Sequence, residues 1–131
     1  MLLDKGININ VHGRIFRTAL HAASKGGHQE IVQMLLNKGA DINANSEYYG
    51  TALRIASKHN YQKIVKMLLD KGSDVNMYYK RYGTALQVAS RYNYQEIVQI
   101  LLDKGADINM QDGIYGTTLH RASQIGHQEI V

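Results

Sequence analysis

The sequence predicts an all-α fold, built as a solenoid of stacked helix-turn-helix units with projecting hairpin loops. The first observation is a period of 33 residues, at which glycine recurs as Gly6, Gly39, Gly72 and Gly105. The second is the similarity between units, because residues 34–66 and 67–99 are identical at 19 of 33 positions. The third is the helical spacing of apolar residues inside each unit. A unit this short cannot bury its apolar face alone, so neighbouring units must stack to form a core.

The first helix of each unit is predicted from a cap and a buried stripe. In the unit at 78–110, Thr84 is expected to begin the helix by accepting a backbone N–H with its hydroxyl. The stripe that follows consists of Ala85, Leu86, Val88 and Ala89. Asn93 is expected to end the helix. Its register, the set of positions 33 residues apart, holds residue types that tolerate positive φ, namely Gly27, Asn60, Asn93 and Gly126.

The second helix of the same unit is predicted from its apolar face, formed by Ile97, Val98, Leu101 and Leu102. Lys104 is expected in its last turn, where a cation meets the negative end of the helix dipole. Gly105 is expected to stop the helix in a left-handed conformation. Asp107 and Asn109 favour side-chain-to-backbone turns in the loop that follows.

Three runs of residues resemble the ankyrin repeat. They are Thr18–Ser24, Gly27–Val32 and Leu35–Asn43, and all three recur in order through essentially all 131 residues. The resemblance implies a stack of antiparallel helix pairs with hairpin loops at right angles, used mainly to bind other proteins.

The chain departs from the family pattern at the start of each unit. The family usually has proline after the capping threonine, but this chain has Ala19, Ala52, Ala85 and Thr118 and no proline at all. The family's usual glycine is replaced by Phe16, Tyr49, Tyr82 and Tyr115, and glycine moves one position later in three units. Arg17 takes that later position in the first unit, which argues against a requirement for positive φ there. Proline-poor arrays of this kind resemble those of filamentous fungi.

The unit boundaries predict one ankyrin-repeat domain over 1–131. It divides into the end of a preceding repeat, three complete repeats and a truncated repeat, at 1–11, 12–44, 45–77, 78–110 and 111–131. Met1–Gly6 resembles the close of a second helix and His127–Val131 the opening of one. We therefore expect a piece of a longer array, present as a monomer or as part of a longer chain.

Composition bounds the class of protein. The chain has no cysteine, so disulfides, thiolate nucleophiles and cysteine-based zinc sites are excluded. Its apolar runs are too short to span a bilayer, and the N-terminus lacks a signal-peptide pattern. We expect an intracellular, cytoplasmic location.

The titratable residues do not predict catalysis. Asp41, Asp74 and Asp107 recur one per unit, so they form no general acid–base pair. The resemblance implies that four histidines hydrogen-bond between neighbouring units, and these are His21, His120, His28 and His127. No phosphate-binding glycine loop or metal motif is present. We expect no enzyme activity, no cofactor and no metal site.

Binding specificity is expected where the units differ, because the shared residues build the framework. The resemblance places these variable registers on the hairpin tips and on the concave face of the first helices. Tyrosine and arginine among them are residue types enriched in interface hot spots. The predicted partner-binding residues are Arg14, Lys25, Tyr48, Lys58, His59, Tyr78, Tyr79, Lys80, Arg81, Arg91, Tyr92, Ile114 and Ile125.

Charge is unevenly distributed along the unit. The hairpin and first-helix segments, 11–28, 44–61, 77–94 and 110–127, carry nine Lys/Arg and two Asp/Glu, a balance of +7. The rest carries six and nine, a balance of −3, which recovers the net charge of +4. A positive face would steer an acidic partner towards it.

The sequence therefore favours a non-enzymatic protein-interaction module that binds a protein, and its positive segments favour a partner with an acidic surface. Nucleic-acid binding through the basic and tyrosine residues is the competing class. A structural spacer, or the sensor arm of a larger multidomain receptor, is a third alternative. An ordinary solvated surface also accounts for the charge.

Overall fold

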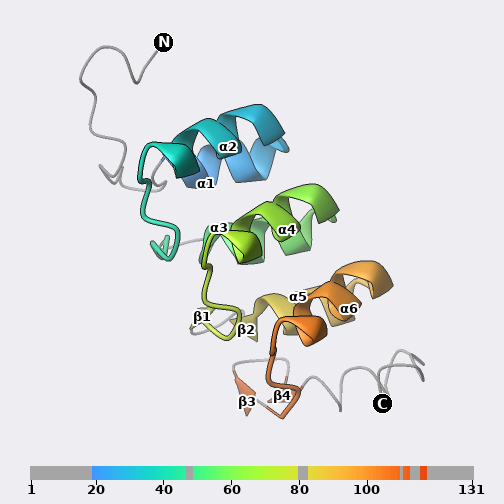
Figure 1. Ribbon diagram of the computed structural model, residues 1–131. Coiled ribbons are helices and arrows are strands. Elements are labelled where there is room, and N and C mark those ends of the chain that lie inside the picture. The colour runs from blue at the N-terminus through green and yellow to red at the C-terminus, as the bar shows by residue number, and fades with distance from the viewer. Residues whose placement is uncertain (1–18, 47–48, 80–82, 110, 113–115, 118–131) are drawn as a thin grey trace.

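The computed structural model describes residues 19–46, 49–79, 83–109, 111–112 and 116–117. These residues form three helix pairs, in which a helix of seven or eight residues precedes one of nine. The helices are α1 (Ala19–Gly26), α2 (Gln29–Asn37), α3 (Ala52–Lys58), α4 (Gln62–Asp70), α5 (Ala85–Arg91) and α6 (Gln95–Asp103). The pairs stack one on another, with α2, α4 and α6 in one row and α1, α3 and α5 behind them (Figure 1). The predicted all-α solenoid is confirmed.

The first helices α3 and α5 each begin at a threonine that satisfies an otherwise unpaired N–H group. Thr51 Oγ1 accepts from the backbone N–H of Arg54 at 3.2 Å. Thr84 Oγ1 accepts from the N–H of Gln87 at 3.1 Å, and Gln87 Oε1 accepts from the N–H of Thr84 at 2.9 Å. This reciprocal pair is a capping box, so the predicted cap at Thr84 is confirmed.

A left-handed residue joins the two helices of each pair. Gly27, Asn60 and Asn93 have φ values of 73°, 62° and 65°. The following N–H then turns back to the first helix, as when Tyr61 donates to the carbonyl of Ala56 at 3.0 Å. The residue types expected to tolerate positive φ therefore occupy that conformation.

The loop after each second helix carries hydrogen bonds within and between units. Gly105 has φ 93° directly after Lys104, which is the C-cap of α6 rather than a member of its last turn. Asp107 Oδ1 accepts from the N–H of Asn109 at 2.9 Å, which confirms the predicted side-chain turn. Asn76 Oδ1 also accepts from the N–H of Asp107 at 2.7 Å, so the loops of adjacent units are tied together.

Short hairpins project from the stack. β1 (Tyr78–Tyr79) pairs with β2 (Gly83–Thr84), and β3 (Gln111–Asp112) pairs with β4 (Gly116–Thr117). Gly50 and Gly83 have φ values of 78° and 76°. A Cβ atom at Gly83 would also collide with the side chain of Gln87. The inference from Arg17 that this register needs no positive φ is therefore wrong for the second and third units, and Arg17 lies outside the described residues.

The leucines of the core lie along two registers of the stack. Leu53 and Leu86 from the first helices and Leu68 and Leu101 from the second are each 1 % exposed or less. The predicted apolar stripe of α5 is buried throughout, whereas Leu102 of α6 is only partly buried. In the Leu-Leu pair of α6, Leu101 is therefore more deeply buried than Leu102.

A row of serines lies inside this core. Ser24, Ser57 and Ser90 share one register on α1, α3 and α5 and are fully buried. Their hydroxyls have no hydrogen-bond partner among the described residues. An unpaired buried hydroxyl destabilises the folded state, because it loses its hydrogen bonds to water.

We therefore predict that Ser57→Ala stabilises the chain by roughly 1–2 kcal/mol, by removing an unpaired hydroxyl and raising helix propensity. Ser46→Ala is the matched control, because Ser46 is buried but its Oγ accepts from the N–H of Tyr49 at 3.3 Å. That change should destabilise. Urea denaturation measures both, and equal effects would contradict the argument.

Leu68→Ala should lower the free energy of unfolding by about 2–5 kcal/mol, through lost transfer energy and the cavity left behind. Leu102→Ala, in the partly buried register, should have a clearly smaller effect. Thermal and urea unfolding measure the difference. A change below about 0.5 kcal/mol for Leu68→Ala would show that this register is not part of the core.

Candidate functional site

A row of cations lies at the ends of the three first helices. Lys25, Lys58 and Arg91 occupy the last turns of α1, α3 and α5 and are all exposed. Because these helices pack side by side, one register becomes one edge of the stack. We call these three residues the cationic row. Each cation also meets the negative end of its own helix dipole, which stabilises it there.

Two members of the cationic row, Lys25 and Arg91, make cation–π contacts with tyrosine rings. Lys25 Nζ lies 4.6 Å from the centroid of the Tyr49 ring and 3.4 Å from the Tyr49 hydroxyl. Arg91 Cζ lies 5.7 Å from the centroid of the Tyr92 ring. Cation–π contacts at exposed sites contribute about 0.5–1 kcal/mol. The cationic row is therefore partly ordered before any partner arrives.

Stacked rings extend the site into the turns between paired helices. The His59 and Tyr61 centroids are 5.7 Å apart at an interplanar angle of 23°, and those of Tyr92 and Tyr94 are 5.7 Å apart at 21°. The Tyr61 hydroxyl also donates to the carbonyl of Lys25 at 3.3 Å, so one unit is fastened to the next beside the row.

Burial and the positive charge of the cationic row both affect the pKa of His59. Burial of the ring lowers the pKa of His59 below its ordinary value of about 6.5, and the positive charges of Lys58 and Lys25 lower it further. His59, Lys58 and Lys25 therefore share one electrostatic environment, although 34 positions separate the first from the last.

The predicted site residues do not form a single cluster. Tyr78 is 48 % exposed on β1, next to the start of α5, while Arg91 and Tyr92 lie at its other end. Seven helical residues separate these ends by about 10 Å. Tyr79 contributes its backbone to β1. The other predicted residues lie outside the described part of the chain, and these are Arg14, Tyr48, Lys80, Arg81, Ile114 and Ile125.

Sequence reasoning missed three tyrosines of this region, Tyr49, Tyr61 and Tyr94. They belong to registers that recur along the chain, so a search for differences between units removed them. A usable signal was Tyr49, which stands where the family usually has glycine. A large ring in a glycine register needs a contact, and Lys25 of the preceding unit provides it.

The histidines have structural surroundings. His21 is 2 % exposed and its Nε2 lies 2.9 Å from the carbonyl oxygen of Ala44, in the closing loop of its own unit rather than in a neighbouring one. His28 is exposed and its ring lies against Gly26, so the expected bond to a neighbouring unit is wrong for His28. His120 and His127 lie outside the described residues.

The described residues offer few other sites. No group of three His, Cys, Asp or Glu side chains among them is placed to hold a metal ion. None of the described helices is long and apolar enough to cross a membrane.

Removing a cation of the row should raise the pKa of His59, since a nearby positive charge disfavours the protonated ring. We predict a rise of a few tenths of a pH unit in Lys25→Gln, measured by NMR titration of the ring. Lys66→Gln on α4 is the control and should leave it unchanged. Equal rises in both variants would contradict the local origin of the shift.

The lowered pKa of His59 makes the stability of the fold depend on pH. The unfolded chain binds this proton more tightly, because unfolding exposes the ring and separates it from Lys25, although Lys58 remains its neighbour in the sequence. The contribution of His59 to stability is therefore complete above about pH 6.5 and falls as the pH drops through the folded pKa.

Comparison with known proteins identifies the architecture. A family model described as ankyrin repeats (3 copies) matches residues 1–79, 50–112 and 78–131. No curated protein matches the chain. Repeats of this family generally act as protein–protein interaction modules and are typically non-enzymatic. Since the three matches together span residues 1–131, the chain belongs to the ankyrin-repeat family.

Proposed function

We propose that the chain is a non-enzymatic module that binds a protein partner with an acidic surface through its first-helix face. The observation that carries this proposal is the cationic row, Lys25, Lys58 and Arg91, which is exposed on one edge of the stack. Tyrosine rings contact two of its members, Lys25 and Arg91. The hairpin tip at Tyr78 is the second contact region. We also propose an intracellular, cytoplasmic location, and a monomer or part of a longer chain.

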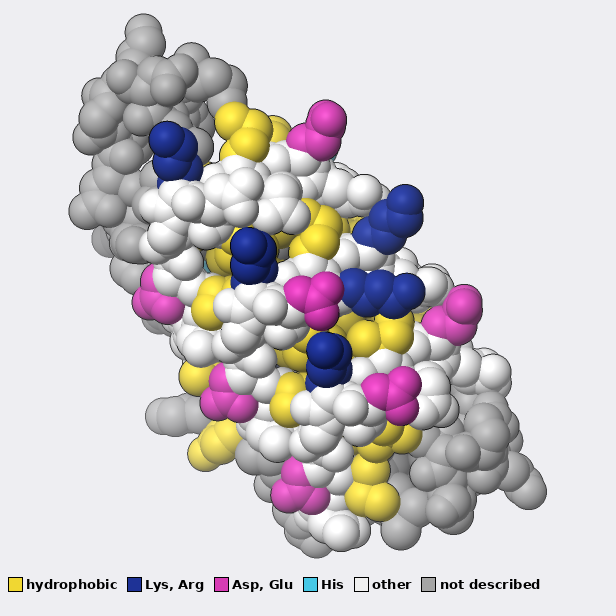
Figure 2. Space-filling view, viewed as in Figure 1, with side chains coloured by type: hydrophobic (Ala, Val, Ile, Leu, Met, Phe, Trp, Pro, Cys, Tyr) yellow, Lys and Arg dark blue, Asp and Glu magenta, His cyan; other side chains and the backbone are white. Residues whose placement is uncertain are grey.

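Charge segregation supports this choice of face. The described residues of α1, α3 and α5 and of the turns after them include three exposed cations and no Asp or Glu. On the opposite side, Lys and Arg lie among Asp and Glu over α2, α4 and α6 (Figure 2). Lys104 there lies 3.5 Å from Asp70 as an ion pair. An acidic partner is therefore attracted to the first-helix face more than to its opposite.

The aromatic residues of the face suit an interface. Tyr92 is 42 % exposed beside Arg91, and Tyr78 is 48 % exposed on the hairpin. Tyrosine and arginine bury large areas with modest entropy loss, which is why they dominate interface hot spots. The carboxylates of Asp41, Asp74 and Asp107 instead accept loop N–H groups, so they serve the fold.

We predict that Arg91→Glu weakens partner binding at least about tenfold, roughly 1.4 kcal/mol, by replacing a hot-spot cation with a repelled anion. A partner recovered with the whole chain would be titrated by calorimetry at moderate salt. Lys66→Glu, the same charge reversal on exposed α4, is the control and should change affinity less than twofold or so. Tyr78→Ala tests the hairpin tip separately.

Losses of equal size from Arg91→Glu and Lys66→Glu would contradict the assignment of the face. Lys66→Glu should retain the unfolding midpoint of the parent chain, because the side chain is exposed. Arg91→Glu should lower the midpoint slightly, since an anion replaces the cation at the negative end of α5 and the contact with Tyr92 is lost. Affinities are therefore compared at a temperature at which both variants are folded.

Nucleic-acid binding and a purely structural role make different predictions. Binding of random oligonucleotides with steep salt dependence would favour nucleic acid, because each neutralised phosphate releases counterions. A spacer, or a sensor arm whose ligand is small, would show neither protein nor nucleic-acid binding on this face.

A further inference from the structure

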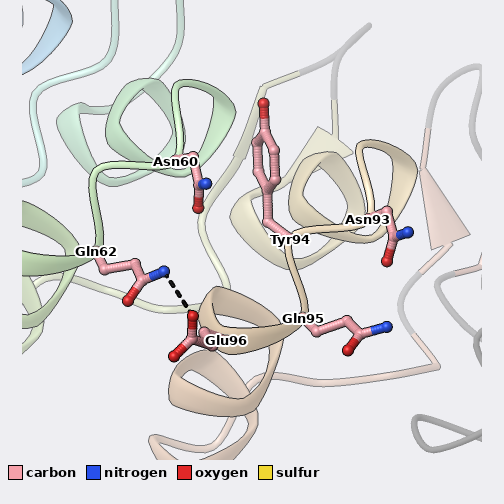
Figure 3. Close-up of a pocket in the computed structure, with 6 residues that line it drawn as sticks. All are labelled: Asn60, Gln62, Asn93, Tyr94, Gln95 and Glu96. Carbon is pink, nitrogen blue, oxygen red and sulfur yellow. Dashed lines mark hydrogen bonds between the residues drawn. The ribbon is translucent and has the colours of Figure 1, made fainter.

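A polar pocket opens on the turn edge of the stack, between the second and third helix pairs. Its volume is about 290 Å³. It is lined by Asn60, Gln62, Asn93, Tyr94, Gln95 and Glu96. Asn60 lies in the turn between α3 and α4, and Gln62 begins α4. Asn93 and Tyr94 lie in the turn between α5 and α6, and the first two residues of α6, Gln95 and Glu96, complete the lining (Figure 3). None of these residues belongs to the cationic row.

The pocket differs from the equivalent junction one unit earlier. There the register of Asn60 holds Gly27, and a Cβ atom at Gly27 would lie 2.9 Å from Cζ of Tyr61. The Tyr61 ring therefore packs directly against Gly27, where no side chain stands in its way. Asn60 carries a side chain at the equivalent place, so the Tyr94 ring cannot settle in the same way, and the Asn60 amide lines the space.

The charge at this junction is also reversed. Glu96 stands in the register of Lys63, so a carboxylate lines this pocket where the earlier junction has an ammonium group. Gln62 Nε2 donates to Glu96 Oε1 at 3.0 Å, which fixes the carboxylate against the α4 side of the pocket. Among the six lining residues, all within the described part of the chain, Glu96 alone is charged.

Glu96 decides which ligands the pocket favours at contact distance. It lies in the first turn of α6, where the helix dipole stabilises a carboxylate. Gln62 begins α4, so two helix N-termini adjoin the pocket, and their partial charges of about +0.5 each roughly offset the charge of Glu96 at longer range. A group in contact with the carboxylate still meets its full charge, so a second anion is disfavoured there and a hydrogen-bond donor is favoured.

We propose that this pocket binds a guanidinium group, the side chain of an arginine in the partner. A guanidinium presents five N–H donors in a plane, and the side of the pocket nearest Gln62 offers the Glu96 carboxylate and the Asn60 amide oxygen as acceptors, whereas the Asn93 side chain points away from them (Figure 3). The Tyr94 ring in the same wall provides a surface on which a planar cation stacks. A lysine ammonium matches this arrangement less well, since it is a compact, strongly hydrated point charge.

This proposal rests on the proposed function and adds to it. It assigns to the protein partner an arginine beside the acidic surface of that partner. Its chemistry is tested with a small molecule instead of the partner. A failure of the pocket therefore leaves the proposed role of the cationic row standing.

The probe is N-acetyl-arginine N-methylamide, added to the whole isotope-labelled chain and followed by NMR. We expect saturable shifts in the side-chain amide of Asn60 and in the backbone N–H groups of residues 94–96. The matching citrulline compound, a neutral molecule of the same shape, should bind about tenfold more weakly, as expected for loss of hydrogen bonds between charged groups. The lysine compound should fall between them.

Two exposed carboxylates provide matched variants. Glu96→Gln should weaken the arginine probe about tenfold, whereas Glu30→Gln, at the same register on α2, should leave it unchanged within about twofold. Asn60→Gly should also weaken binding while folding normally, because φ at this position is 62° and the earlier unit has glycine there.

Three results would overturn the proposal. They are the absence of saturable shifts with the arginine probe, equal binding of citrulline, and unchanged binding in Glu96→Gln. Saturation by a neutral probe alone would instead assign the pocket to an uncharged polar ligand.

Discussion

Burial of apolar surface between neighbouring units is the interaction on which the rest of the structure depends. A single helix pair has no interior of its own, and Leu53 and Leu68 of the second pair are buried because another described pair lies on each side of them. Packed helices lie about 8–10 Å apart, so residues at one register form a row at that spacing. The cationic row, the buried serines and the loop hydrogen bonds between Asn76 and Asp107 all follow from this stacking.

The same stacking imposes conditions at some registers and leaves others open. His21, Arg54 and Gln87 share one buried register, yet each finds a different partner: the Ala44 carbonyl, the Tyr49 carbonyl and the Thr84 N–H. Most buried polar side chains are hydrogen-bonded, but the repeat does not prescribe with which atom. This explains how three residue types of different charge occupy equivalent positions without disturbing the repeat.

Local rules were enough to predict the helices and their ends from the sequence. Thr84 as a cap and Asn93 and Gly105 as left-handed stops depend only on neighbours within a few residues. The contacts of Tyr49 with Lys25 and of Tyr61 with Gly27 join different units, so their geometry depends on the stack. The pocket was missed for the same reason, since Asn60 was interpreted only as a helix stop and Glu96 only as a surface residue. Its composition depends on which registers face each other across two units.

Together the two proposed sites impose a direction on any partner. Arg91 ends α5, and Asn93 of the pocket follows it by two residues, so a cationic edge and a carboxylate-lined pocket adjoin. A uniformly acidic partner surface would be attracted by the cationic row but repelled by the carboxylate of Glu96 in the pocket. A partner with an arginine beside its acidic residues satisfies both in one orientation, because reversing it places like charges together. Specificity in such a repeat array then arises where equivalent junctions differ, here in Asn60 against Gly27 and in Glu96 against Lys63. The registers that build the stack remain unchanged.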